Sequence, residues 1–291
     1  MPYTEKALAA GRHLADVVVP HAAFRDALDL IANALDMGNA VGLFAGVRVI
    51  APSGSGKSLL IDCLQRNMID SPYLTEPLSV IRTELKEAPS VSQIQGGLLD
   101  NFGYGLTGKG RATSNNNEVH GVLIEAMRAH KVQLVVLDEF QHIFSPASHK
   151  VSTQVIDWLK RLMNLARVPV VLVGSKLMDR LEGADPQLTS RIPTVIRLPA
   201  FQCDAQWVGF LKAFAKESVA VDLSPIFDRQ IALHLFRVTQ GVPRELKRLL
   251  VQAVMMAVDA DEVSITPARL HMAYAKVYGP DKAAEDPFRV S

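Results

Sequence analysis

The stretch VIAPSGSGKSLL, residues 49–60, decides the fold, because it places a glycine-rich turn between an apolar strand and an apolar helix. The spacing of Gly54, Gly56 and Lys57 is typical of a loop that surrounds phosphate groups with backbone N–H donors at the start of a helix. Such loops usually begin with glycine, whereas this chain has Ala51. We expect the alanine to be tolerated if its φ is negative, since the two glycines allow the close approach to phosphate.

The loop predicts ATP as the ligand and Mg²⁺ as its companion ion. Lys57 can reach the β- and γ-phosphates, and the Ser58 hydroxyl can ligate the metal. Pro52 has no N–H, so we expect the donors to come from residues 54–59. A surface loop rich in glycine and serine is the alternative, which the position between strand and helix disfavours. The predicted nucleotide contacts are Pro52, Ser53, Gly54, Ser55, Gly56, Lys57, Ser58 and Leu59.

A second motif, LVVLDEF at residues 134–140, ends the most apolar strand pattern of the chain in two acids. Asp138 is predicted to hold Mg²⁺ through its water shell, and Glu139 to accept a proton from an attacking water. An acidic pair after a strand is by itself most often a solvated turn. Its place about 80 residues beyond a phosphate-loop lysine favours a hydrolytic pair, and a water-activating glutamate favours an ATPase over a metabolite kinase.

The overall composition is that of a packed globular protein. The chain has 291 residues, of which 48% are hydrophobic and 21% charged, and its net charge is +1. A net charge this small excludes a chain-wide positive field for nucleic acid or membrane, so any such binding must be local. Cys63 and Cys203 are isolated, and no zinc-ligand spacing is present. Without a signal peptide or a long apolar run, we expect a reduced cytoplasmic protein that does not associate with a membrane.

Five apolar segments alternate with helical patterns and predict an α/β fold with a parallel, doubly wound sheet. The segments are residues 41–50, 78–85, 132–140, 168–175 and 193–199. Helices are expected at 22–37, where Gly38 supplies a stop, and at 57–69, 90–102, 118–130 and 151–166.

After Phe201 the pattern is helical alone, over 204–217, 225–239, 243–259 and 266–277. We therefore expect three parts. Residues 1–200 would form N-terminal helices plus the α/β core, 201–279 a small helical domain, and 280–291 a loose tail.

Three further stretches carry a resemblance to a known family. They are VVLVGSK at 170–176, PQLTSRIPTVIRLPAF at 186–201 and GVPRELKRLL at 241–250. With the two motifs above, the chain resembles an AAA+ ATPase, and within that superfamily it is similar to the TniB/TnsC group, whose members regulate DNA transposition. The resemblance covers roughly residues 20–278. It implies an AAA+ P-loop NTPase fold, with a five-stranded parallel sheet followed by a small all-α lid.

The resemblance also implies roles for residues beyond the two motifs. Ser175 would orient the attacking water from the end of the fourth strand, although asparagine is commoner there. Arg191 would reach the γ-phosphate of a neighbouring subunit, where a guanidinium can neutralise transition-state charge. Arg180 is the reserve for that role.

The nucleotide would be contacted from two other segments. Arg244, one turn into a helix, matches the family's second sensor, although a helix-start arginine paired with Glu245 is the ordinary reading. The family holds the base with the segment before the loop, where Val19, His21 and Phe24 are candidates. A histidine in such a place is more often a packing or capping residue.

A loop at 103–117 has the composition for contacts to a nucleic-acid backbone. Lys109, Arg111 and Thr113 are its candidates, and the resemblance implies that they follow duplex DNA without reading its sequence. Most lysines in such loops are simply solvated. The absence of aromatic stacking residues favours duplex over single strands.

With the two ATP motifs, the resemblance implies a DNA-binding regulator that assembles as a ring or helical filament on duplex DNA and directs a transposase to its target, with ATP hydrolysis releasing the assembly. Two alternatives stay open. A nucleotide-gated adaptor would bind ATP and a protein partner but no DNA, and a motor ATPase would translocate along duplex.

Overall fold

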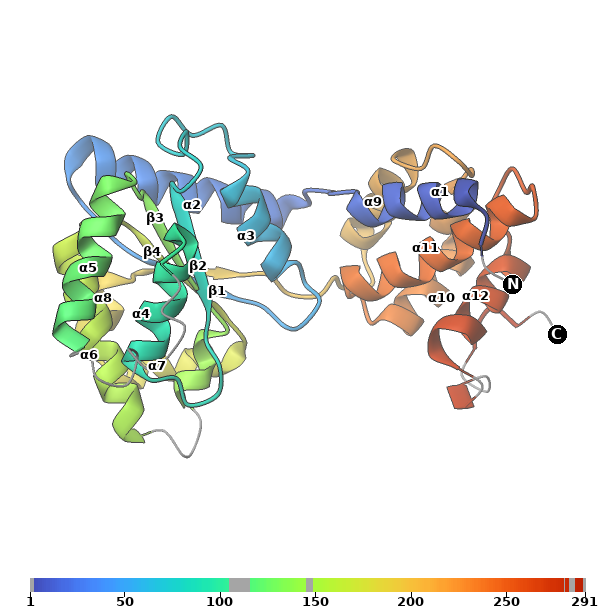
Figure 1. The fold of residues 1–291 in the computed structure, drawn as a ribbon. Coiled ribbons are helices and arrows are strands. Elements are labelled where there is room, and N and C mark those ends of the chain that lie inside the picture. Colours follow the sequence, from blue (N-terminus) through green and yellow to red (C-terminus); the bar gives the residue numbers. More distant parts are fainter. Residues whose placement is uncertain (1–2, 105–115, 145–148, 280, 283–285, 290–291) are drawn as a thin grey trace. The chain divides into compact units, whose positions relative to one another are not determined.

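The structure is a computed structural model that describes residues 3–104, 116–144, 149–279, 281–282 and 286–289. The chain folds into two compact units. One is an α/β unit of residues 22–198, and the other is a helical unit that joins residues 1–21 to residues 199–291. Figure 1 shows the sheet with its helices in the first unit and α1 with α9 to α12 in the second.

The α/β unit is built on a five-stranded sheet in which all strands are parallel. The strands are β1 (Val47–Ile50), β2 (Val80–Glu84), β3 (Leu134–Asp138), β4 (Val170–Gly174) and β5 (Thr194–Arg197), in the order β2-β3-β4-β1-β5. The predicted fold class is confirmed. Each strand is shorter than its apolar segment; Val41 of the first segment, for example, is helical and exposed.

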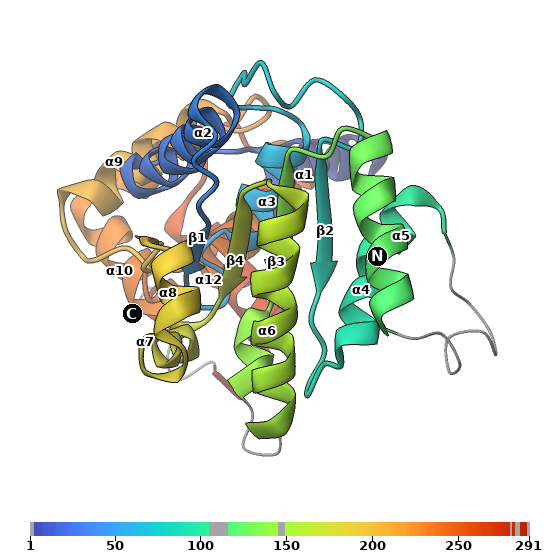
Figure 2. The ribbon, with the colours of Figure 1, turned by 90° about the vertical axis from the view of Figure 1, so that its left-hand side faces the viewer.

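Helices surround this sheet, and α6 lies in front of it in Figure 2. They are α2 (Ala22–Val41), α3 (Lys57–Gln65), α4 (Val91–Leu99), α5 (Asn116–Ala129), α6 (His149–Ala166), α7 (Leu181–Ala184) and α8 (Pro186–Arg191), with 3₁₀ turns η1 (Asp100–Phe102), η3 (Phe140–Phe144) and η5 (Lys176–Arg180). Alternate strand residues, such as Val135 and Leu137, join the core formed with α4, α5 and α6. Of the other helices, α2 and α3 contact each other, and α2 contacts β1 and β5.

Helix α2 ends later than the sequence predicts. Gly38 was expected to stop it, but the helix continues to Val41 and ends at Gly42, whose φ is +75°. Gly38 is needed for packing instead, since a Cβ there would lie 2.8 Å from Cδ1 of Phe44. A helical glycine can therefore mark close packing as well as a helix end.

The helical unit contains α1 (Glu5–Asp16), α9 (Ala205–Lys216), α10 (Arg229–Thr239), α11 (Pro243–Asp259) and α12 (Pro267–Tyr278), with the turn η6 (Ser224–Phe227). Helix α1 lies against α11 so closely that a Cβ on Gly11 would be 2.6 Å from Sδ of Met255. Lys247 of α11 donates to the carbonyls of Ala15 and Val17, at the end of α1, at 2.6 and 2.7 Å. Burial lowers the pKa of this lysine.

These contacts change the expected domain division. Residues 1–200 were predicted to form one part, but residues 1–21 belong to the helical unit, where Ala7, Ala10 and Leu14 are buried in the core. The second boundary between the two units falls between residues 198 and 199.

The expectation of a loose tail is wrong for two of its residues. Asp286 and Phe288 are buried, and Phe288 belongs to the core of the helical unit. Asp286 contacts Nδ1 of His271 on α12 at 2.5 Å. Residues 286 and 288 of the tail are therefore packed against the helical unit.

Candidate nucleotide-binding and hydrolysis site

The glycine loop has the backbone geometry that phosphate binding requires. Gly54 and Gly56 have φ of +83° and +102°, a region that favours glycine. Gly56 caps α3, whose first helical hydrogen bond runs from the N–H of Leu60 to the carbonyl of Gly56. The N–H groups of residues 57–59 precede that bond and can be donated to a ligand.

Ala51 fits at the start of the loop without strain. It is 1% exposed, and its φ is outside the left-handed region. Its N–H donates to the carbonyl of Gly174 at 2.9 Å, which joins the loop to the end of β4. Ala51 therefore has the negative φ on which its expected tolerance depended.

Two polar side chains of the loop fit an anionic ligand. The Ser55 hydroxyl is buried and, within the described part of the chain, has no hydrogen-bond partner. Lys57 is 11% exposed, and its Nζ lies 3.4 Å from the carbonyl of Ala51 and 3.5 Å from Oε1 of Glu139. A largely buried ammonium and an orphaned hydroxyl beside the first N–H groups of a helix are the donors that a triphosphate needs.

The acidic pair lies at the same edge of the sheet as the loop. β4 lies between β1 and β3, and its register pairs Leu172 with Leu137 of β3 and Gly174 with Ile50 of β1. The carboxyl ends of these strands therefore bring Asp138 and Glu139 beside Lys57. Glu139 has φ of +52°, which is uncommon for a residue other than glycine and often marks a functional site.

Burial raises the pKa of Asp138, and the carboxylates of Glu139 and Glu84 add to that effect. The N–H of Glu139, which donates to Oδ1 of Asp138 at 2.8 Å, and Lys57 oppose it. A carboxylate that is poorly solvated gains from a cation. Asp138 and the Ser58 hydroxyl are oxygen ligands of the kind that Mg²⁺ prefers when phosphates supply the rest of its shell.

Ser175 follows β4, and its main chain is joined to the acidic pair by a residue that the sequence analysis missed. Gln141 of η3 accepts a hydrogen bond from the Ser175 N–H at 2.9 Å and donates from Nε2 to Oε2 of Glu139. The Ser175 hydroxyl accepts from the N–H of Leu177 at 3.4 Å. The only sequence signal for Gln141 is a polar residue two positions after the acids.

Arg191 lies at the opposite end of the sheet from the loop. Its carbonyl accepts from the N–H of Gly46 at 2.8 Å, just before β1, whereas the loop begins just after β1. The five residue steps from Gly46 to Ala51 span about 16 Å of strand. Arg191 is therefore remote from the phosphate loop of its own chain.

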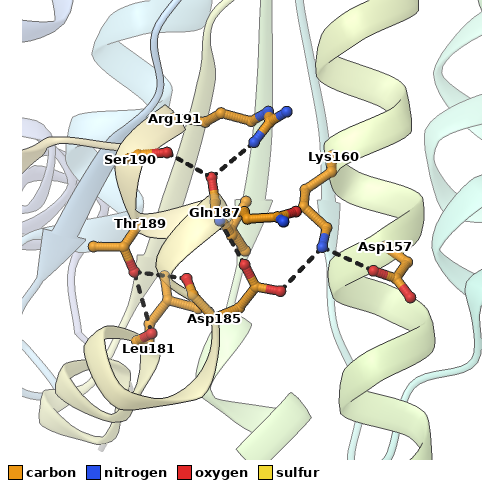
Figure 3. Close-up of polar contacts among 9 residues, drawn as sticks. Asp157, Lys160, Leu181, Asp185, Gln187, Thr189, Ser190 and Arg191 are labelled. Atoms are coloured by element: carbon orange, nitrogen blue, oxygen red, sulfur yellow. Dashed lines mark hydrogen bonds and ion pairs between the residues drawn. The ribbon is translucent and has the colours of Figure 1, made fainter.

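Short contacts fix the helix that carries Arg191 (Figure 3). Asp185 caps α8 by accepting from the N–H of Leu188 at 2.7 Å, and its other oxygen lies 3.0 Å from Nζ of Lys160 on α6. Lys160 also contacts Asp157 at 2.9 Å. At the other end of α8, Nη1 of Arg191 donates to the carbonyl of Gln187 at 2.9 Å.

Arg180, the reserve candidate, ends η5, on the side of the sheet where β4 ends. Its Nη1 lies 3.5 Å from the carbonyl of Phe144. The structure thus separates the two arginines between opposite ends of the strands.

The candidates for base contacts divide between the two units. Phe24 belongs to the α/β unit, and its ring lies 3.6 Å from the place of a Cβ on Gly56. His21 and Val19 belong to the helical unit, where the ring of His21 lies 4.8 Å from that of Phe201. Arg244 also belongs to that unit, and its side chain is 55% exposed. Its Nε lies 3.8 Å from Oε1 of Glu245, the pairing that the sequence offered as the alternative to a nucleotide contact.

The DNA candidates Lys109, Arg111 and Thr113 lie outside the described residues. Within the described ranges, no helix is both long enough and apolar enough to span a bilayer.

The AAA+ P-loop fold is defined by the sheet order, the glycine loop after β1, the acidic pair after β3 and the helical unit. The model of the family described as "Bacterial TniB protein" matches residues 12–203, so the chain belongs to the TniB family. No curated protein matches the chain.

Solved structures confirm the fold class. The ORC2 protein of Aeropyrum pernix, solved as ADPNP-ADP complexes, has a TM-score of 0.66 and 16% identity, with 91% of this chain and 71% of that chain covered. The ORC1 protein of Aeropyrum pernix, solved in complex with DNA, has a TM-score of 0.64 and 17% identity, with 92% and 69% covered. The RuvB branch migration motor of Thermotoga maritima has a TM-score of 0.51 and 14% identity, with 89% and 71% covered.

Proposed function

We propose that the protein is an ATP-dependent transposition regulator that assembles on duplex DNA and directs a transposase to target DNA, and that ATP hydrolysis controls its disassembly. The observation that carries the proposal is the gathering of Lys57, Asp138, Glu139 and Ser175 around the glycine loop of a TniB-family chain.

Each residue at this edge has a distinct part in the proposed reaction. Backbone N–H groups of the loop and Lys57 bind the phosphates, and Ser58 and Asp138 hold Mg²⁺, which when bound neutralises charge on the phosphate oxygens. Glu139 accepts the proton of a water whose oxygen bonds to the γ-phosphorus. The bond from that phosphorus to the β–γ bridging oxygen breaks, and ADP leaves with its electron pair.

The position of Arg191 supports a role between subunits. It lies about one strand length from its own loop, so it can complete a site only in a neighbouring molecule. A site completed in this way would hydrolyse ATP only when subunits are assembled, which would couple turnover to assembly. In the family, Arg244 would contact ATP from the helical unit as a second sensor.

Two substitutions test the ATP site. Lys57→Ala should abolish ATP binding, because it removes the cation beside the loop. Glu139→Gln should retain binding but stop turnover, and should trap assemblies on DNA. Binding is measured with a fluorescent ATP analogue and turnover by phosphate release. Unchanged turnover in either variant would contradict the site assignment.

A gel shift with duplex DNA and a slowly hydrolysed ATP analogue tests the DNA partner. We expect binding that weakens steeply with salt and falls when Lys109 and Arg111 are both changed to alanine. Absence of binding at low salt would favour the nucleotide-gated adaptor. Sustained movement along duplex, measured by displacement of a bound oligonucleotide, would favour a motor.

A further inference from the structure

Gln141 occupies a position between two residues of the proposed reaction. Its side chain is 9% exposed and contacts Glu139 through Nε2 and the main chain of Ser175 through Oε1. Glu139 follows β3 and Ser175 follows β4, so Gln141 joins the carboxyl ends of adjacent strands. The same side chain thus contacts the proposed base and the residue expected to orient water.

The direction of both hydrogen bonds follows from chemistry. The Ser175 N–H can only donate, so the end of the Gln141 amide that faces it must be the oxygen. The amide nitrogen then faces Glu139 and donates to its carboxylate. The N–H of Ser175, just after β4, therefore fixes the amide orientation, and the amide nitrogen donates to Oε2 of Glu139.

Gly174 provides the space for this arrangement. A Cβ at residue 174 would lie 2.4 Å from Oε1 of Gln141 and 2.4 Å from Sδ of Met178. Met178 is fully buried, so it cannot move aside easily. The carbonyl of Gly174 also accepts from the N–H of Ala51, so the residue that admits Gln141 contacts the phosphate loop as well.

The two oxygens of Glu139 have different partners. Gln141 holds Oε2, and Oε1 lies 3.5 Å from Nζ of Lys57. When Lys57 binds phosphate instead of Oε1, Oε1 becomes the oxygen that can accept a proton. This requires that Oε2 stays fixed by Gln141. Orientation of a base to within a fraction of an ångström affects rate strongly.

We propose that Gln141 is a positioning residue for ATP hydrolysis, which orients the Glu139 carboxylate and couples it to the main chain of Ser175. The inference rests on the proposed ATPase function and names a residue that acts through Glu139. Gln141 itself transfers no proton, since an amide is neither acid nor base at neutral pH.

Two substitutions at Gln141 separate orientation from packing. Gln141→Met keeps the side-chain length and removes both hydrogen bonds. Gln141→Glu can still accept from Ser175 but cannot donate, and it places a like charge beside Glu139. We expect kcat to fall about tenfold to a hundredfold in both, and further in the glutamate variant, because of charge repulsion. The KM for ATP and the Kd of an ATP analogue should change less than about threefold.

Gly174→Ala is an independent variant, because it displaces Gln141 without removing it. It should lower kcat in the same way while Gln141 remains present. Gln154→Met, an exposed change on α6, is the control and should leave kcat, KM and thermal unfolding as in the native protein. Circular dichroism checks that each variant is folded.

The measurements are made on the full chain with duplex DNA, ATP and Mg²⁺. Native kcat in folded Gln141→Glu or Gly174→Ala protein would overturn the inference. A loss of nucleotide affinity as large as the loss of kcat would also overturn it, because it would indicate a packing role alone. Lys57→Ala distinguishes failure of the proposed ATPase function from failure of the positioning role of Gln141. If the native protein shows no turnover that depends on Lys57, the proposed function fails; if it does and the Gln141 variants match native kcat, the positioning role alone fails.

Discussion

At the scale of single residues, the phosphate loop depends on glycine at some positions and not at others. Ala51 is buried with its N–H bonded to Gly174, outside the left-handed region, so alanine costs nothing there. Gly56 has φ of +102°, where a Cβ strains the backbone even though it would make only ordinary contact with Phe24. The usual first glycine of such loops is thus dispensable in this chain.

Substitution at these two positions tests that difference. Ala51→Gly should change ATP affinity less than about threefold, whereas Gly56→Ala should weaken it by about tenfold to a hundredfold, from a backbone strain of about 1–3 kcal/mol. Titration with a fluorescent ATP analogue measures both. Equal effects of the two changes would mean that the left-handed conformation of Gly56 does not matter for binding.

His120 is a buried residue whose charge should affect stability. Nε1 of Trp158 donates to its Nδ1 at 3.1 Å, which requires that nitrogen to be unprotonated. Burial, and next the charge of Arg161, lower the pKa of His120 below its ordinary value near 6.5. The folded protein therefore binds fewer protons than the unfolded chain below pH 6.5, and stability falls as pH decreases through that window toward the lowered pKa.

We expect the free energy of unfolding to decrease below pH 6.5 by up to about 1.4 kcal/mol per pH unit from this group. His120→Gln retains an oxygen that can accept from Trp158 and removes the titration. Urea unfolding at a series of pH values compares the two proteins. An identical pH slope in both would show that His120 is not responsible.

At the scale of elements, helix α8 connects the core to Arg191. Its N-cap Asp185 is fixed by Lys160 of α6, and its last carbonyl is bonded to Gly46 before β1. The direction of the arginine thus depends on contacts at both ends of a short helix. Loss of the cap should disturb Arg191 without affecting the loop at the other end of β1.

Asp185→Ala removes the cap and a partner of Lys160, at a cost of about 1 kcal/mol in stability. ATP turnover of the assembled protein should decrease, and ATP affinity should not, as measured by phosphate release and analogue titration. Asp157→Ala is the matched control, since it removes the exposed partner of Lys160 and leaves the cap intact. Equal turnover in the two variants would contradict a role for the cap.

The sequence predicted the elements whose pattern is local, and it missed those that depend on distant partners. All five strands and the glycine loop follow from apolar runs and spacing. Helix α8 was not predicted, since Asp185 and Pro186 interrupt the helical pattern although they are its cap and first residue. Gln141 was missed because its contact with Ser175 joins residues 34 positions apart.

At the scale of the whole molecule, the two units are not successive segments of the chain. Residues 1–21 belong to the unit that also contains residues 199–291, so the α/β unit is inserted between parts of the helical unit. The sequence suggested no partner for the first helix, because its apolar residues pack on α11, more than 200 positions away. The chain therefore enters and leaves the α/β unit through the helical unit.

The central claim at this scale is that Arg191 of each subunit completes the ATP site of another. A mixture of two inactive variants tests it most directly. Arg191→Ala lacks the arginine but keeps Glu139, and Glu139→Gln lacks the base but keeps the arginine. Each alone, with duplex DNA, ATP and Mg²⁺, should hydrolyse little ATP. Turnover should return when the two are mixed, because some interfaces then combine both native residues. Continued inactivity of the mixture, with both variants folded, binding ATP and assembling together, would contradict it.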